Sequence, residues 1–169
     1  MTETSPVPPE PASATGGRIV VGVDGSEPSL KALCWAAHQA TLTGCSLDAV
    51  IAWEVPAAYG WAGLPAGMPE DYDLQSSAGA VLEQAIAAAL TPAQAVSVSR
   101  VVVAGNPAQA ILDRGEGAEL IVVGVRGHGT FRATLLGSVS HTVTLHASCP
   151  VVVVRESAQV PLPEQPSQD

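Results

Sequence analysis

The chain has 169 residues, a length that fits one domain with one hydrophobic core. Seven lysine and arginine residues stand against sixteen aspartate and glutamate residues, and the net charge of −9 argues against nucleic-acid binding. Hydrophobic residues make up 47% of the chain but aromatic residues only 4%, so the core must consist mainly of Val, Leu, Ile and Ala. Such a core is typical of buried parallel strands covered by Ala-rich helices.

Neither a secretion signal nor a membrane segment is expected. Residues 1–17 lack the basic and apolar regions of a signal peptide, and no apolar run reaches the roughly 18 residues that a membrane helix needs. The three cysteines, Cys34, Cys45 and Cys149, are irregularly spaced and form no CxxC pair, which is typical of reduced thiols. These features predict a cytoplasmic protein without a role at a membrane.

Both ends of the chain have a composition that cannot form a core. Residues 1–17 and 157–169 are rich in proline and polar residues, and both segments are predicted to be disordered tails. Residues 18–156 are therefore expected to form the single domain.

The first half of this domain alternates between strand and helix patterns. The β-branched run Arg18–Asp24 predicts a strand, and apolar residues recur at helical spacing from Pro28 to Leu42. The second predicted strand is Ser46–Trp53. A connection rich in Pro, Gly and aromatic residues, Glu54–Asp73, then leads to a predicted helix over Leu74–Leu90.

The second half continues the alternation. Val96–Val103 predicts the third strand, and a proline suited to the first helical position opens a short helix over Pro107–Arg114. The apolar run Glu119–Val125 predicts the fourth strand. A last helix over Ser138–Ala147 and a fifth strand over Pro150–Arg155 complete the domain.

This alternation predicts an α/β fold of Rossmann-like type. We expect one open, doubly wound sheet of five parallel strands with helices on both faces. The pattern is compatible with the strand order 3-2-1-4-5, in which the first and fourth strands are neighbours. Ligands of such sheets bind beyond the carboxyl ends of the strands, where the winding direction reverses. Asp24 and the segment that begins at Gly124 would then face each other there.

The stretch GVRGHGTFRATLLGSVS, from Gly124 to Ser140, has a composition unsuited to a core. Its first three glycines remove side chains and allow positive φ, so that backbone amides can converge on an anion. The residues from Gly137 to Ser140 begin a serine-capped helix, whose free amides and dipole favour an anion as well. No Asp or Glu occurs from Leu120 to Arg155, although this span holds Arg126, Arg132 and Arg155. A bound phosphate explains this segregation.

Common phosphate motifs do not fit this stretch. A Walker A loop requires Gly-Lys-Ser/Thr, and the only lysine, Lys31, lies in the first predicted helix. A dinucleotide fingerprint starting at Gly127 would lack its third glycine and would follow the fourth strand instead of the first.

The spacing of Gly124, Gly127 and Gly137-Ser138, which is GxxG followed after nine residues by GS, resembles the ATP-binding signature of the universal stress protein family. The resemblance extends to VVGVDGS, GNPAQAIL, ELIVVGVRGHG, LLGSVS and HASCPVVVV, which follow one another in the family's order. Together these blocks span Gly17 to Arg155. The chain is identified as similar to the ATP-binding branch of that family.

The resemblance implies a site for ATP and Mg²⁺. In it, Gly22 and Val23 would lie against the adenosine, Asp24 near the ribose or a phosphate-bound Mg²⁺, and Val50 in the adenine pocket. The residues expected to wrap the ribose and the phosphates are Gly124, Val125, Arg126, Gly127, His128, Gly129 and Thr130. The residues expected to hold the β and γ phosphates are Gly137, Ser138, Val139 and Ser140.

The resemblance also implies a homodimer that pairs through the fifth strand. The residues concerned, Val151, Val152, Val153 and Val154, form an apolar edge that would otherwise favour aggregation.

Three classes of function remain open. The first is a nucleotide-dependent regulatory or stress-response protein. The second is an ATPase or phosphotransferase, for which Asp24, Arg126 and His128 are the only visible helpers, so hydrolysis would be slow and no catalytic residue is assigned. The third is a dimerisation module without nucleotide, which the intact glycines disfavour. Asp24 could instead cap the first helix, and Arg126 and His128 could be ordinary surface residues.

Overall fold

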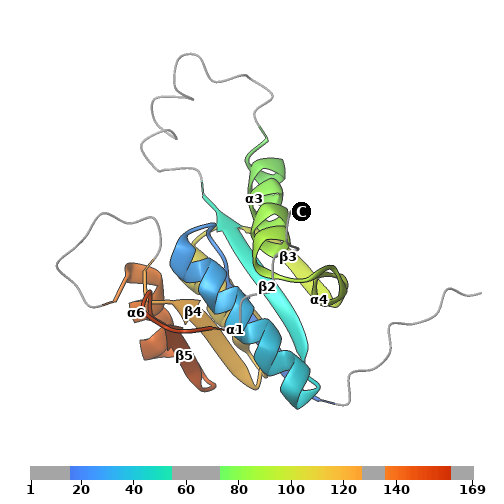
Figure 1. Ribbon diagram of the computed structural model, residues 1–169. Coiled ribbons are helices and arrows are strands. Elements are labelled where there is room, and N and C mark those ends of the chain that lie inside the picture. The colour runs from blue at the N-terminus through green and yellow to red at the C-terminus, as the bar shows by residue number, and fades with distance from the viewer. Residues whose placement is uncertain (1–15, 55–72, 127–135, 161–169) are drawn as a thin grey trace, which may run out of the picture.

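A computed structural model describes residues 16–54, 73–126 and 136–160 of the chain (Figure 1). Five parallel strands form one sheet in the order β3-β2-β1-β4-β5, which confirms the predicted fold class and strand order. The strands are β1 (Arg18–Gly22), β2 (Ser46–Trp53), β3 (Val98–Ala104), β4 (Leu120–Gly124) and β5 (Val151–Val154). The helices are α1 (Glu27–Thr43), α3 (Leu74–Ala89), α4 (Pro92–Val96), α5 (Pro107–Gly115) and α6 (Ser138–His146).

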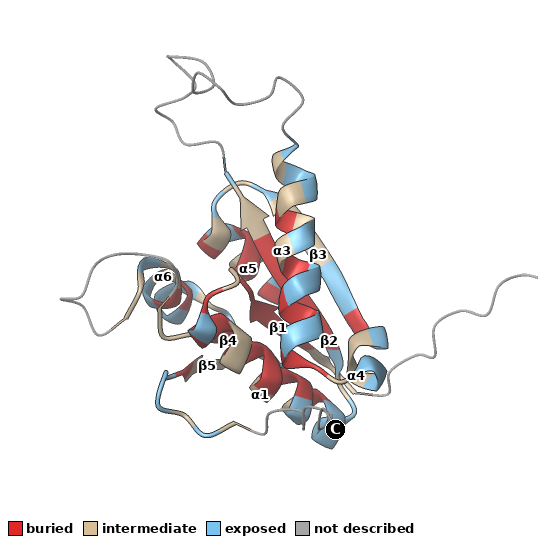
Figure 2. Cartoon of the chain, turned by 45° about the horizontal axis from the view of Figure 1, so that its top comes forward, coloured by how far each residue is buried: buried red, intermediate tan, exposed pale blue. Residues whose placement is uncertain are grey.

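Helices cover both faces of the sheet, and each face has its own apolar cluster (Figure 2). Val21 and Val122 pack with the side chains of α1 and α3 on one face. Val20 and Ile121 pack with those of α5 and α6 on the other. Each fully buried Val, Leu or Ile stabilises the fold by about 1.5–3 kcal/mol relative to an exposed one. The aliphatic core expected from the composition is thus divided between two layers.

The segment between α3 and β3 differs from the prediction. The sequence predicts a strand from Val96, but Pro92–Val96 forms the short helix α4 and the strand begins at Val98. Thr91 and Gln94 form a reciprocal capping box, and a proline occupies the start of the helix. These local interactions favour a helical turn over continuation of the strand.

The predicted tails fall mostly outside the described residues, as do most of the connection after β2 and residues 127–135. The described part nevertheless extends beyond the predicted domain boundary at 156. Ala158 and Val160 pack against the apolar cluster on the α1 face. The Nζ of Lys31 in α1 also donates to the backbone oxygen of Glu156. The chain therefore remains attached to the domain for several residues after β5.

A buried carboxylate joins the amino ends of the strands to the end of α5. Asp48 in β2 is only 5% exposed at its side chain and accepts a hydrogen bond from Arg114 Nε at 2.7 Å. Arg18 Nε lies 3.6 Å from the same oxygen, and Arg18 Nη2 donates to the backbone oxygens of Arg114 and Glu116. This cluster lies at the edge opposite the carboxyl ends of the strands.

Candidate functional site

The carboxyl ends of β1 and β4 adjoin each other at the centre of the sheet. Ile19 pairs with Leu120 and Val21 with Val122, so the loops that follow the two strands leave from the same edge. The chain runs from β1 toward β2 on one side and from β4 toward β5 on the other. This is the reversal of winding at which open α/β sheets bind ligands.

The turn after β1 is held by its own polar side chains. Gly25 has a positive φ of 81°, which a side chain would disfavour. Asp24 Oδ1 accepts hydrogen bonds from the backbone N and the hydroxyl of Ser26, and Ser26 in turn caps α1 by accepting from Ser29 N at 3.4 Å. The alternative that Asp24 shapes the start of α1 is therefore observed, and its role toward a ligand stays a prediction.

Gly124 is needed for a different reason from the one that the sequence suggested. Its φ is not positive, but a Cβ atom there would lie 2.7 Å from the backbone carbon of Pro28. A Cβ at Gly22 would lie 2.6 Å from Ile111 Cδ1, the end of a side chain that can shift more easily than backbone. The two glycines allow α1 and α5 to pack directly against the strand ends, which brings the start of α1 close to β4.

The start of α6 is attached to the end of β4. Gly137 N donates to Val125 O at 2.8 Å, and the Ser140 hydroxyl contacts Val125 O and Gly137 O at 3.0 Å each. These bonds close the intervening loop at its base. Ser140 is buried, and its hydroxyl is engaged by these carbonyls, so the side chain anchors the base of the loop. The expectation that Ser140 holds phosphate stays a prediction.

Helix α6 also begins without the predicted serine cap. Its N-cap residue is Gly137, which has no side chain to cap the first amides, whereas Ser138 is the first helical residue and is exposed. The other described helices begin at residues whose side chains accept from the first turn, namely Ser26, Asp73, Thr91 and Asn106. The first amides of α6 therefore lack a side-chain acceptor from the N-cap, beside the reversal point of the sheet.

Two predicted site residues belong to the core. Val50 is 1% exposed, and its side chain packs in the cluster on the α5 face. Val23 is buried as well, and its backbone N donates to Val50 O at 2.8 Å. The prediction that Val50 lines the adenine pocket is not tested by this burial and stays a prediction. Val50 pairs with Gly22, the last residue of β1, and β2 continues for three more residues to Trp53.

Residues 16–155 match the sequence profile of the universal stress protein family. The chain belongs to this family. The universal stress protein Rv2623 of Mycobacterium tuberculosis is 38% identical over 153 residues, which cover 89% of this chain and 48% of the relative. The chain thus spans about half the length of the curated relatives that it matches.

Solved universal stress proteins share the fold. One, described as a complex with cAMP, is 27% identical, covers 84% of this chain and 98% of its own, and has a TM-score of 0.54. UspA from Lactobacillus plantarum is 22% identical and has a TM-score of 0.64, and the match covers 85% of this chain and 100% of UspA. The family fold therefore extends over nearly the whole described part of this chain.

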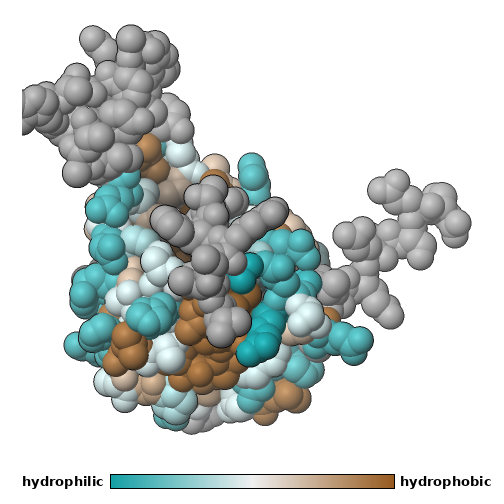
Figure 3. All heavy atoms as spheres, turned by 90° about the vertical axis from the view of Figure 1, so that its left-hand side faces the viewer, coloured by the Kyte–Doolittle hydropathy of each residue, from teal (hydrophilic) through white to brown (hydrophobic). Residues whose placement is uncertain are grey.

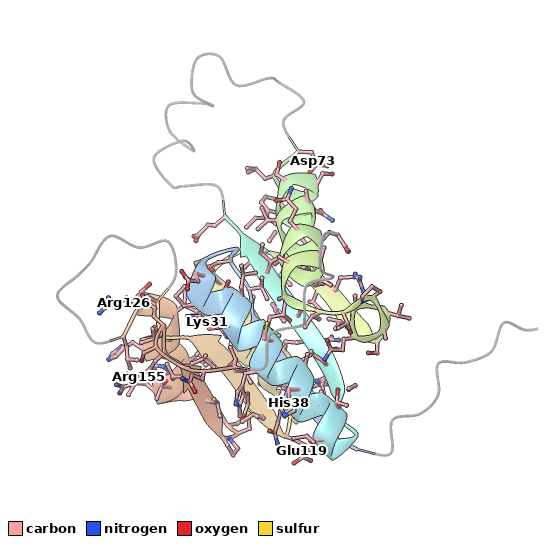
Figure 4. All side chains as sticks on the ribbon, in the orientation of Figure 1. Lys31, His38, Asp73, Glu119, Arg126 and Arg155 are labelled. Carbon is pink, nitrogen blue, oxygen red and sulfur yellow. The ribbon has the colours of Figure 1, made fainter. Side chains whose placement is uncertain are left out.

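Arg126 and Arg155, which belong to the span without acidic residues, place positive charge at this edge. Arg126, which follows β4, is half-buried, and Arg155, which follows β5, is exposed. Figure 4 shows both on the side of the molecule that carries α6. Gly127, His128, Gly129 and Thr130, the centre of the predicted phosphate loop, lie outside the described residues. The structure thus brings together Asp24, Gly124, Arg126, Gly137 and Ser138 at one edge.

The cysteines are not part of the candidate site at the carboxyl edge of the sheet. All three are free thiols, and Cys34 is buried with its Sγ donating to Ala89 O at 3.0 Å. Burial raises the pKa of the Cys34 thiol and also that of Cys149. A raised pKa makes a thiol a poorer nucleophile and metal ligand near neutral pH. These two cysteines therefore act as apolar packing residues.

No group of three or more His, Cys, Asp or Glu side chains in the described part of the chain could hold a metal ion. None of the helices described is both long and apolar enough to span a membrane.

Proposed function

We propose that this universal stress protein binds an adenine nucleotide at the carboxyl edge of β1 and β4 and acts as a nucleotide-dependent regulatory protein. The observation that carries the proposal is the start of α6, a helix without a side-chain cap that is attached to β4 at the reversal point of the sheet. Amides at a helix N-terminus and the positive end of the helix dipole favour phosphate. The related structure described as a complex with cAMP supports a nucleotide ligand.

We further propose that the ligand is ATP with Mg²⁺. The support is the spacing of Gly124, Gly127 and Gly137-Ser138, together with the positive charge of the span from Leu120 to Arg155. Mg²⁺ at nucleotide sites is usually held by one or two carboxylates and by phosphate oxygens. Asp24 offers a carboxylate at this edge, so the residues fit an ion that arrives with the nucleotide. Such an ion would neutralise phosphate charge and orient the phosphates.

In the proposed contact set, the backbone of the β1 end and the start of α6 do most of the binding. The turn residues Gly22, Val23 and Asp24 would contact the nucleoside, whereas Ser138 and Val139 would offer amides to the phosphates. Arg126 would contribute charge, and Gly127, His128, Gly129 and Thr130 remain proposed members through the family spacing. Val50 and Ser140 also remain proposed members, through their backbone groups, because the Val50 side chain and the Ser140 hydroxyl are buried.

Regulation by binding is favoured over rapid turnover. Phosphoryl transfer needs a positioned base and a cation beside the γ phosphate. Asp24 is the described carboxylate in the turn after β1, and its Oδ1 already accepts two hydrogen bonds from Ser26. Slow hydrolysis is the second candidate, because Asp24 and Arg126 flank the same edge. It would appear as phosphate release that disappears in Asp24→Ala.

We also propose that the protein forms a homodimer in the cytoplasm. β5 is the outer strand next to β4, and Val151, Val152 and Val153 are only half-buried. The face that carries β5 has a large hydrophobic area (Figure 3). Pairing of two β5 strands would cover this edge, as exposed apolar edges otherwise favour aggregation. The three free thiols agree with a reducing compartment.

The test of the proposed function begins with the purified full chain. Nucleotide released by denaturation is identified by chromatography, and the melting temperature is measured with ATP and Mg²⁺, ADP, AMP or cAMP. A bound ligand raises the melting temperature because it stabilises only the folded state. We expect a rise with ATP and Mg²⁺. A chain that carries no nucleotide and does not respond to any of the four would contradict the proposal.

A further inference from the structure

Arg155 follows the last strand at the same edge as the proposed site. Val154 pairs with Gly124, and Val125 N donates to Val154 O at 2.8 Å. Arg155 is thus level with Val125 and one residue short of Arg126 along the neighbouring strand. Adjacent strands are about 4.8 Å apart. Figure 4 shows the two arginines on the same side of the molecule as α6.

The backbone at Arg155 is held in place although its side chain is exposed. Ala158 N donates to Arg155 O at 3.0 Å and closes a turn. The next residue, Glu156, receives a hydrogen bond from Lys31 Nζ at its backbone oxygen. Ala158 and Val160 then pack against the cluster on the α1 face. Arg155 is therefore presented from a fixed turn at the edge of the sheet.

The guanidinium of Arg155 has no carboxylate partner within the described part of the chain. Other basic residues of that part, namely Arg18, Lys31, Arg100 and Arg114, do form ion pairs with carboxylates. The span that ends at Arg155 contains no Asp or Glu. An arginine placed in this way can form paired hydrogen bonds with a phosphate group.

The side-chain alternation of β5 also favours this role. Val152 packs against the cluster on the α1 face, whereas Val151 and Val153 pack against the cluster on the α5 and α6 face. Continued by one residue beyond Val154, which lies on the α1 face, this alternation directs Arg155 toward the side where α6 begins.

We propose that Arg155 is a second phosphate-binding cation of the site and that it sets a preference for polyphosphate nucleotides over cyclic or single phosphates. This inference rests on the proposed function. A single phosphate occupies the start of α6 beside Arg126. The additional phosphates of ADP or ATP extend along the edge, where a guanidinium on the neighbouring strand meets them. Arg155 thereby selects for the number of phosphates and not for the base.

The test is calorimetric titration of the full chain with ATP and Mg²⁺, ADP, AMP and cAMP. In Arg155→Ala we expect the Kd for ATP to rise about fivefold, as for a partly exposed charge-assisted contact, while the Kd values for AMP and cAMP change by less than about twofold. Arg155→Lys should recover part of the loss, because it keeps the charge but not the paired geometry. The matched control is Arg100→Ala, which removes an arginine that pairs with Glu83 at 2.7 Å on β3, the opposite outer strand.

The outcomes separate the two proposals. A wild-type chain that binds none of the four nucleotides contradicts the proposed function itself. A wild-type chain that binds ATP, together with an Arg155→Ala variant that loses no ATP affinity or loses affinity equally for ATP and AMP, leaves the nucleotide site intact and overturns the role of Arg155. A similar loss in Arg100→Ala would also overturn it, because the effect would then reflect net charge.

Discussion

At the amino edge of the sheet, arginines are paired with a carboxylate of the chain itself, whereas at the carboxyl edge they lie in a span without acidic residues. Asp48 supplies the anion for Arg114 and Arg18 at the amino edge. From Leu120 to Arg155 the span itself contains no acidic residue. An arginine that pairs with Asp48 is structural. Arg155 has no carboxylate partner among the described residues, so we propose that an external anion pairs with it.

The helix starts show the same contrast. Helix α3 begins at Asp73, whose carboxylate accepts from Gln75 N and Ser76 N. Helix α6 begins at Gly137, which has no side chain. An anion at a helix N-terminus is stabilising, and α3 carries its own. The start of α6, which has no side-chain cap, lies beside the reversal point, and we propose that a phosphate takes there the role that Asp73 has in α3.

The largest effect is expected from the amino edge. Asp48→Asn removes a buried charge and leaves two arginines without their counter-charge, so we expect the free energy of unfolding to fall by about 3 kcal/mol. Urea denaturation measures this. Glu83→Gln, in a more exposed pair with Arg100, is the control and should change stability by less than about 1 kcal/mol. Equal effects of the two substitutions would show that the amino-edge cluster is not structural.

The next effect is expected where α1 meets β4. Gly124→Ala places a Cβ 2.7 Å from the Pro28 backbone, so we expect a loss of about 2 kcal/mol in stability and weaker nucleotide binding as the start of α1 shifts. Gly79→Ala is the matched control, because nothing lies within 4 Å of its Cβ position in α3. That variant should gain up to about 1 kcal/mol from helix propensity. A neutral Gly124→Ala would mean that the close packing is not required.

The smallest effect concerns the cap of α3 and its dependence on pH. Hydrogen bonds from the Ser76 side chain and backbone lower the pKa of Asp73 below its ordinary value of 3.8. The ionised form is thus favoured by folding, and its contribution is fully present above about pH 3.8 and lost as the pH falls through the lowered value. Asp73→Asn should therefore melt below wild type at pH 7, with a gap that narrows in strong acid. A gap independent of pH would contradict this.

Most of the fold could be predicted from alternating apolar runs, because each buried parallel strand is a nearly continuous run of Val, Ile or Leu. Helix α4 could not be predicted from apolar periodicity because it has only five residues. Thr91 and Gln94, which form its capping box, are the sequence signal that indicates it. Asp48 was also missed, because a carboxylate within an apolar run shows its partners, Arg18 and Arg114, only once the chain is folded.

The site was harder to predict than the fold. Glycine spacing indicates positions where a side chain is not tolerated, but it does not show whether the cause is a positive φ or close packing against a neighbouring element. At Gly124 the cause is close packing against Pro28. The burial of the Val50 side chain could not be predicted, because the depth of a strand residue depends on its register with β1. The role of Ser140 depends on a carbonyl fifteen residues away in the sequence, Val125 O, which no local pattern reveals.

The central claim, that the start of α6 receives phosphate, is tested most directly at Ser138. This residue is exposed and first in the helix, so Ser138→Glu should not destabilise the fold, but its carboxylate would occupy the place of the phosphate. Titration with ATP and Mg²⁺ should show affinity reduced by about tenfold or more in Ser138→Glu and nearly unchanged in the uncharged Ser138→Gln. Undiminished ATP affinity in Ser138→Glu would contradict the account.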